Sequence, residues 1–156
     1  MKQLITLTAI FLTSYFGFTQ TRELDSLTIQ LTFEKRDSVK IETSIELIKL
    51  LFDNKDFEKA LLYINRSEQL SYDLNYDLAL AELKYLKALI YTQNSDYYNA
   101  IDNYKRSLSL YVSLKDTLGI AKVNNSLGGV EIARGNYTIG LQYALYAIDI
   151  FERKNQ

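Results

Sequence analysis

Apolar and small residues recur at helical spacing along most of the chain, whereas the alternation with a period of two that marks strands is scarce. Gly135 suits a left-handed helix stop. Helix starts follow from side chains that can accept a hydrogen bond from the first unpaired backbone N–H groups: Asp56, Ser95 or Asp96, Asp116 or Thr117, and Asn136. The pattern predicts an all-α fold with helices at residues 38–52, 57–72, 76–93, 97–114, 118–134 and 137–154.

One apolar stripe is repeated three times at an interval of forty residues, beginning at Phe57, Tyr97 and Tyr137. Three further triplets each keep one residue class: Ala60, Ala100 and Gly140; Leu61, Ile101 and Leu141; Leu70, Leu110 and Ile150. Stripes in register indicate hairpins that stack along a shared hydrophobic seam. We expect an α-solenoid of three antiparallel hairpins at residues 38–75, 76–115 and 116–156. Four tyrosines are assigned to its core: Tyr97, Tyr104, Tyr111 and Tyr137.

Small residues stand twelve positions apart in two copies: Ala88 with Ala100, and Gly128 with Gly140. With the aromatic residue at Tyr97 or Tyr137 and the SLG sequence at 126–128, these pairs resemble the tetratricopeptide repeat (TPR) family. The resemblance implies that the small residues lie where paired helices approach most closely. The chain departs from the family in its period of forty instead of about thirty-four, and in its lack of proline. Ile48 at the small position of the first copy predicts a less regular first hairpin.

The TPR resemblance implies a function in protein–protein interaction, with the first helix of each hairpin lining a concave groove. The family's inward-facing positions correspond here to Glu42, Ile45, Lys49, Phe52, Glu82, Tyr85, Leu89, Gln93, Lys122, Asn125, Gly129 and Ile132. This mixture of apolar and charged side chains suits an extended peptide or a partner helix. The family's clamp for a C-terminal carboxylate is not expected, because Ile45, Tyr85 and Gly129 interrupt the basic and asparagine residues that it needs. A solvated face without a ligand is the alternative.

The last helix is apolar on nearly every side, because only Gln142 and Asp149 are polar between positions 141 and 151. Three explanations stay open: a partner protein or second copy docks there, residues 22–35 fold over it, or the chain is the front piece of a longer protein. We expect self-association or partner capture, including a homodimer, through Leu141, Leu145 and Ile148.

Composition excludes several classes of function. The 18 basic and 19 acidic residues form no long run of either sign, which argues against nucleic acid as a partner. Histidine and cysteine are absent, and with them the commonest general base, the commonest metal ligand and the thiolate nucleophile. The acidic pairs Asp53/Asp56, Asp73/Asp77 and Asp149/Glu152 are interpreted as helix caps and solvated charges. We therefore expect no catalytic residues, no metal site and no small-molecule cofactor.

Residues 1–19 have the pattern of a cleaved secretory signal peptide, with Lys2 before an apolar stretch and small residues at Gly17 and Thr19. The apolar stretch, about fifteen residues, is shorter than the ~20 that span a bilayer, so an uncleaved membrane anchor is the less favoured alternative. We expect export to the periplasm or the extracellular space.

Residues 20–37 carry Leu24, Leu27 and Leu31 at helical spacing, which indicates a degenerate helix. For the chain as a whole the main hypothesis is an exported, non-catalytic protein-interaction module. The alternative is the N-terminal sensory TPR segment of a larger envelope signalling protein, such as a histidine kinase or a transcription regulator.

Overall fold

The computed structural model describes residues 22–154, and this part of the chain contains seven helices and no strand. A first helix covers residues 22–33. The others are α2 (Asp37–Asp53), α3 (Phe57–Asp73), α4 (Asp77–Gln93), α5 (Tyr97–Ser113), α6 (Thr117–Ala133) and α7 (Tyr137–Lys154). Each of these six begins and ends within one residue of the bounds that the capping residues predict, and the all-α solenoid is confirmed. The predicted signal peptide at residues 1–19 lies outside the described residues.

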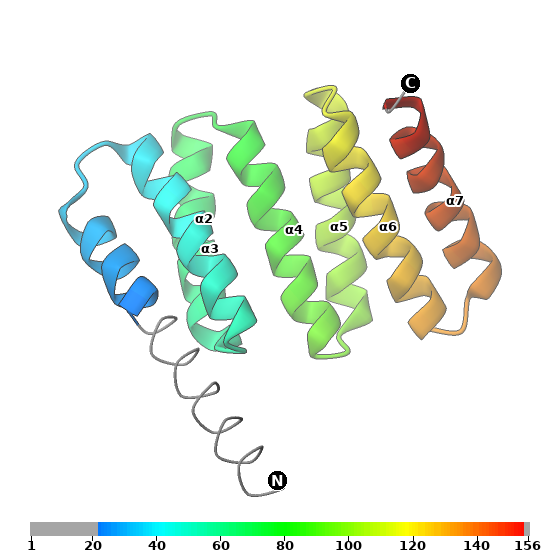
Figure 1. Cartoon of the computed structure of the whole chain (residues 1–156), viewed down its shortest axis with the longest axis horizontal. Coiled ribbons are helices and arrows are strands. Elements are labelled where there is room, and N and C mark those ends of the chain that lie inside the picture. Colours follow the sequence, from blue (N-terminus) through cyan, green and yellow to red (C-terminus); the bar gives the residue numbers. More distant parts are fainter. Residues whose placement is uncertain (1–21, 155–156) are drawn as a thin grey trace, which may run out of the picture.

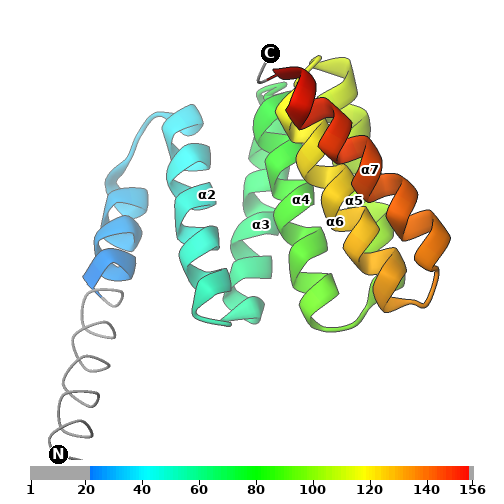
Figure 2. The same ribbon diagram turned by 45° about the vertical axis from the view of Figure 1, so that its right-hand side comes forward.

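The six labelled helices form antiparallel hairpins in two layers (Figure 1). Helices α2, α4 and α6 lie side by side in one layer, and α3 and α5 lie behind them. Helices α3 and α5 each pack against the first helix of the next hairpin as well as against their own partner. Helix α7 packs against α6 at one end of the array, and residues 22–33 lie beside α2 at the other end (Figure 2).

All five turns between these helices have the same geometry. A residue with left-handed backbone stands two positions after the end of each helix from α2 to α6, at Lys55, Asn75, Ser95, Lys115 and Gly135, with φ of 61, 53, 59, 56 and 85°. In the first turn the Lys55 N–H donates to the Phe52 carbonyl and the Asp56 N–H to the Leu51 carbonyl, both at 2.9 Å. This is the Schellman pattern, and the other four turns repeat it. A helix of 17 residues and a turn of this kind recur every twenty residues, which explains the forty-residue period.

The residue that follows each left-handed position directly precedes the first residue of the next helix. The side chains of Asp56, Asp96 and Asp116 accept hydrogen bonds from backbone N–H groups of the first turn. The structure therefore selects Asp96 over Ser95 and Asp116 over Thr117 as caps. The left-handed stop predicted at Gly135 is confirmed.

Two clusters of buried side chains form the core. The first, around Leu47 and Leu83, lies between α2, α3 and α4. The second, around Tyr104 and Leu127, lies between α4, α5 and α6. Leu89 packs against both clusters, so the core continues from one hairpin to the next.

The predicted small pairs lie at the closest approach of paired helices. A Cβ on Gly128 would stand 2.9 Å from the Gly140 carbonyl oxygen, and one on Gly140 would stand 2.8 Å from that of Gly128. Ala88 and Ala100 are fully buried. Where Ile48 replaces the small residue, α2 and α3 are less closely packed than the helices of the other two hairpins, as expected.

The core assignment of Tyr137 is wrong, because its side chain is 70% exposed. Tyr104 and Tyr111 are buried, and Tyr97 packs against the second cluster. The difference follows from position in the array. Tyr97 packs against a cluster that includes residues of α6, whereas in the described residues no further helix follows α7 to supply the corresponding residues.

Residues 22–33 do not fold over α7, which rules out that explanation for the apolar last helix. Instead Leu24, Leu27 and Leu31 pack against the first core cluster, at the opposite end of the array (Figure 1). This helix therefore covers the outer side of α2.

Candidate functional site

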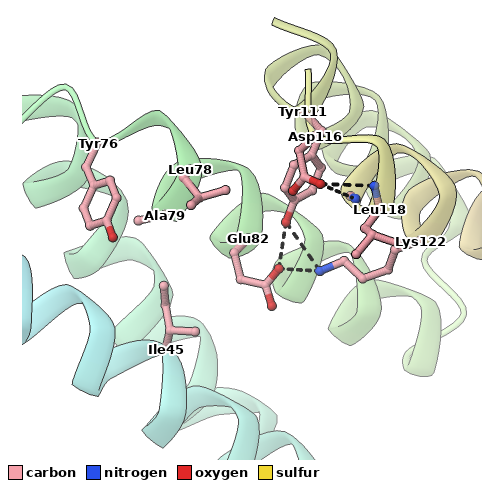
Figure 3. A pocket seen from close by; sticks show the side chains of 10 residues that line it. Ile45, Tyr76, Leu78, Ala79, Glu82, Tyr111, Asp116, Leu118 and Lys122 are labelled. Carbon is pink, nitrogen blue, oxygen red and sulfur yellow. Dashed lines mark hydrogen bonds and ion pairs between the residues drawn. The ribbon is translucent and has the colours of Figure 1, made fainter. Parts of the chain in front are cut away.

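A hollow of about 350 Å³ lies between the first helices of successive hairpins, and we call it the central hollow (Figure 3). Helix α2 supplies one residue, and most of the wall comes from the first turns of α4 and α6. The lining residues are Ile45, Tyr76, Leu78, Ala79, Glu82, Tyr111, Asp116, Leu118, Gly119 and Lys122. The walls are therefore mainly apolar, and charged groups are concentrated around Glu82.

Glu82 is the centre of a charged network that joins three hairpins. Its carboxylate forms ion pairs with Lys49 of α2, at 3.0 Å, and with Lys122 of α6. The Tyr111 hydroxyl of α5 donates to the same carboxylate at 2.8 Å. Figure 3 shows the Glu82 carboxylate directed toward the Lys122 ammonium group and the Tyr111 hydroxyl. The network ties α2, α5 and α6 to α4.

Two aromatic rings hold the Lys122 ammonium group near Glu82. The nitrogen lies 4.2 Å from the ring centroid of Tyr85 and 5.4 Å from that of Tyr111. Such cation–π contacts are strongest when the groups are partly removed from water, as they are here. The Tyr85 hydroxyl lies 3.2 Å from Ser126 Oγ, which fixes the ring between α4 and α6.

The network decides the protonation state of Glu82. Burial raises the pKa of Glu82, but the charge of Lys122 and the hydrogen bonds from Lys122, Tyr111 and Lys49 outweigh burial and leave the pKa below its ordinary value. Burial and the adjacent Glu82 charge raise the pKa of Tyr111, so its hydroxyl stays protonated and donates. Glu82 is thus an ionised acceptor near neutral pH.

Three predicted groove residues, one from each hairpin, line the hollow: Ile45, Glu82 and Lys122. Lys49 and Tyr85 join them through the ion pair and the cation–π contact described above. Glu42 lies at the border, where its carboxylate accepts a hydrogen bond from the Tyr76 hydroxyl at 3.1 Å. The predicted positions therefore meet mainly around the middle hairpin.

The other predicted groove residues lie elsewhere. Phe52 and Leu89 pack against the core, with the Phe52 ring 5.6 Å from that of Phe57. Gln93, Asn125 and Gly129 are exposed, and a Cβ on Gly129 would meet nothing within 4 Å. Ile132 is 46% exposed and leans on Gly140 of α7.

Sequence reasoning missed the lining residues that come from helix starts and from the second layer. Tyr76, Leu78, Asp116 and Leu118 lie in or beside the first turns of α4 and α6. Tyr76 and Asp116 are forty residues apart, as are Leu78 and Leu118, so the repeat itself contained the signal. Tyr111 lies on α5 and reaches the hollow from behind, which no inward-facing pattern on the first helices predicts.

The predicted docking residues of α7 are exposed. Leu141, Leu145 and Ile148 have exposed fractions of 56, 56 and 50%. They lie at the end of the array, away from the central hollow (Figures 1 and 2). The two surfaces are separate.

Within residues 22–154, no group of three or more acidic side chains is arranged to hold a metal ion. None of the helices described there combines the length and the apolar character needed to traverse a bilayer.

The fold is similar to those of two solved structures. Aspartyl phosphate phosphatase F from Bacillus subtilis matches 88% of this chain with a TM-score of 0.79 and 18% identity, over 39% of its own chain. BtubC (BKLC) from P. vanneervenii matches 86% with a TM-score of 0.67 and 17% identity, over 55% of its own chain. The chain thus spans less than two thirds of either protein. No protein-family model and no curated protein match the sequence. The likeness shows the fold, and the chain is an all-α, TPR-like solenoid of stacked helix hairpins.

Proposed function

We propose that the chain is a non-catalytic protein-interaction module that binds a peptide segment or a helix of a partner protein at the central hollow. One observation carries the proposal: side chains from three successive hairpins converge on a single hollow of about 350 Å³. This volume lies at the lower end of the range for ligand pockets, and repeat arrays bind partners on surfaces built from adjacent repeats.

The lining suits an anchoring apolar side chain. Leu78 and Leu118 stand on opposite walls and are 48 and 44% exposed, so a bound aliphatic or aromatic side chain would remove both from water. The carboxylates of Glu42 and Asp116 at the border can accept hydrogen bonds from the backbone N–H groups of a bound segment. Apolar anchoring with polar groups at the rim is the usual organisation of a protein interface.

A non-catalytic role agrees with the chemistry of the hollow. Lys122 and Glu82 neutralise each other, and the raised pKa of Tyr111 keeps its hydroxyl protonated, so that it is not available as a base near neutral pH. The sequence supplies no histidine or cysteine as an alternative general base or nucleophile.

A displayed library of random 12-residue peptides tests the proposal. Peptides enriched on immobilised protein are expected to contain an apolar anchor and to bind Ile45→Arg at least tenfold more weakly, because the charge would enter the hollow. Leu62→Arg is the matched control, because Leu62 lies on α3 and is already 48% exposed. Failure to enrich any peptide, or equal loss in both variants, would contradict binding at the hollow.

We also propose that the repeats are of the TPR type with a forty-residue period, and that the protein is exported after cleavage before Gln20. The small pairs support the first proposal, and the charged start and apolar stretch of residues 1–19 support the second. The mass of the chain recovered from the cell envelope or medium tests export, because it should correspond to a chain that begins at Gln20.

The alternative proposal is a sensory segment of an envelope signalling protein. In that case the central hollow would bind the peptide ligand that the protein senses. Its test is the reading frame, where a hydrophobic span and effector sequence after Gln156 would favour it. The exposed face of α7 around Leu141, Leu145 and Ile148 is proposed as a second docking surface in either case.

A further inference from the structure

Helix α7 repeats an apolar surface of α5. On α5 that surface packs with residues of α6. On α5, Tyr111 belongs to the cluster that also contains Val123, Leu127 and Val130 of α6, and Tyr97, Ile101 and Leu108 are partly buried against that cluster. Forty positions later stand Tyr137, Leu141, Ile148 and Phe151, which we call the α7 seam. Their exposed fractions are 70, 56, 50 and 41%. The α7 seam thus repeats a surface that is buried or partly buried on α5, in a place where the described chain leaves it open.

We propose that the α7 seam is covered by the α7 seam of a second copy, with the two helices antiparallel about a two-fold axis near Ala144 and Leu145. The proposal rests on the proposed docking role of α7 and names its occupant. In this arrangement Leu141 of each copy lies beside Ile148 of the other.

The array explains why α7 itself is the matching surface. Within the array, the second helix of each hairpin is covered by the first helix of the next hairpin, which is α4 or α6. Both α4 and α6 are already packed between neighbouring helices within each copy. Helix α2 has the same role in the first hairpin, and residues 22–33 cover its outer side. Among residues 22–154, no first helix of a hairpin is therefore left free, whereas two α7 seams are complementary through a two-fold axis.

The charges favour the antiparallel orientation. Within each copy Asp149 and Arg153 form an ion pair at 2.9 Å. Glu152 follows the seam in the last turn of α7. An antiparallel pair places Glu152 beside the helix start at Tyr137 of the other copy, where the helix dipole and the tyrosine hydroxyl favour a negative charge. A parallel pair would place the two Glu152 carboxylates side by side.

Sedimentation of the purified protein between micromolar and millimolar concentration tests the association. We expect a dimer, and we expect Leu145→Glu to weaken it at least tenfold. Tyr146→Glu is the matched control on the same helix, because Tyr146 is 53% exposed but lies about 100° around the helix from Leu145. It should change the dimer dissociation constant by less than threefold.

Engineered disulfides test the register, since the sequence contains no cysteine. Mixed under mild oxidation, a Leu141→Cys protein and an Ile148→Cys protein should form a disulfide with each other. Neither should link to itself, because seven residues separate the equivalent positions by ~10 Å along the axis, beyond the reach of a disulfide. Self-linked Leu141→Cys and Ile148→Cys dimers without the mixed product would indicate parallel helices and overturn the proposal.

A monomer at millimolar concentration would also overturn it and would assign the α7 seam to a different occupant. That result leaves the central hollow to be judged separately. Selected peptides that bind the Leu145→Glu variant as tightly as the original protein would retain the interaction function while the dimer is lost.

Discussion

Gly119 lies directly against the ring of Tyr111, with no room for a Cβ between them. The contact seats the ring so that its hydroxyl donates to Glu82 at 2.8 Å. Glycine at this one position therefore sets the wall of the central hollow and holds the donor that Glu82 needs. In the preceding hairpin the equivalent residues are Ala79 and Ser71, a pair that needs no such clearance.

Replacing Gly119 by alanine should destabilise the protein by about 1–3 kcal/mol, because the added methyl group must push the Tyr111 ring or α6 aside. Urea unfolding followed by circular dichroism measures the change. Gly129→Ala on the same helix is the control, since its added methyl group meets nothing within 4 Å. That variant should gain up to ~1 kcal/mol from helix propensity. Equal shifts in the two variants would show that the Tyr111 contact has no energetic role.

The pH dependence of stability should report Glu82. Because its folded-state pKa is lowered, the Glu82 network stabilises the folded state above the unfolded pKa of ~4.3 and is lost as pH falls through the folded value. The difference in unfolding free energy between the original protein and Glu82→Gln should be constant from pH 6 to 7 and shrink below about pH 4.3. Exposed Glu46→Gln is the control. A difference that grows toward low pH would contradict this sign.

The left-handed backbone at the turns predicts that glycine is more stable than alanine at the positions with positive φ. Lys115 has φ of 56°, which costs a residue with a Cβ roughly 1–2 kcal/mol, so Lys115→Gly should be stabilising by up to ~1 kcal/mol after the entropy loss of glycine. Gly135→Ala, at φ of 85°, should be destabilising by about as much. Lys115→Ala should leave the unfolding midpoint nearly unchanged, because it keeps a Cβ at the same φ. Thermal unfolding of the three variants measures these changes. A Lys115→Ala variant that is stabilised as much as Lys115→Gly would contradict the role of the left-handed φ.

A buried ion cluster between α3 and α4 predicts strong coupling. Glu68 pairs with Lys84 at 3.0 Å and with Lys87 at 3.2 Å, and both Glu68 and Lys84 are buried. Glu68→Leu leaves a buried lysine without its carboxylate and should cost about 3–5 kcal/mol. The double variant Glu68→Leu/Lys84→Met should recover most of that loss. Additive effects in this double-mutant cycle would mean that the pair is not coupled.

The repeat made the fold predictable from the sequence, because capping residues and apolar stripes recur together at one interval. Gly128 and Gly140 illustrate this, since the family resemblance that their spacing carries implied the closest approach that the structure shows. The left-handed Lys55 and Lys115 were not foreseen, because their conformation is imposed by the Schellman hydrogen bonds and not by their side chains. Tyr137 was placed in the core because a stripe shows which face is apolar but not whether a neighbour covers it.

The candidate site was predictable only in part. The TPR resemblance implied Ile45, Glu82 and Lys122 as inward-facing residues, and the structure brings them together. Equivalent reasoning placed Phe52 and Leu89 in the groove, whereas their size and apolar character direct them into the core. The contribution of Tyr111 depends on the clearance at Gly119, a three-dimensional relation that one-dimensional spacing does not contain.

Because all five turns have the same geometry, they determine which lengths of insertion or deletion preserve the array. Each junction sends the next helix back in the same way, so an insertion or deletion of forty residues would preserve which helices belong to the front layer. A change of twenty would exchange the layers for every helix downstream. Evolution of the array by duplication should therefore proceed in whole hairpins, with side chains on the front layer free to diversify one unit at a time.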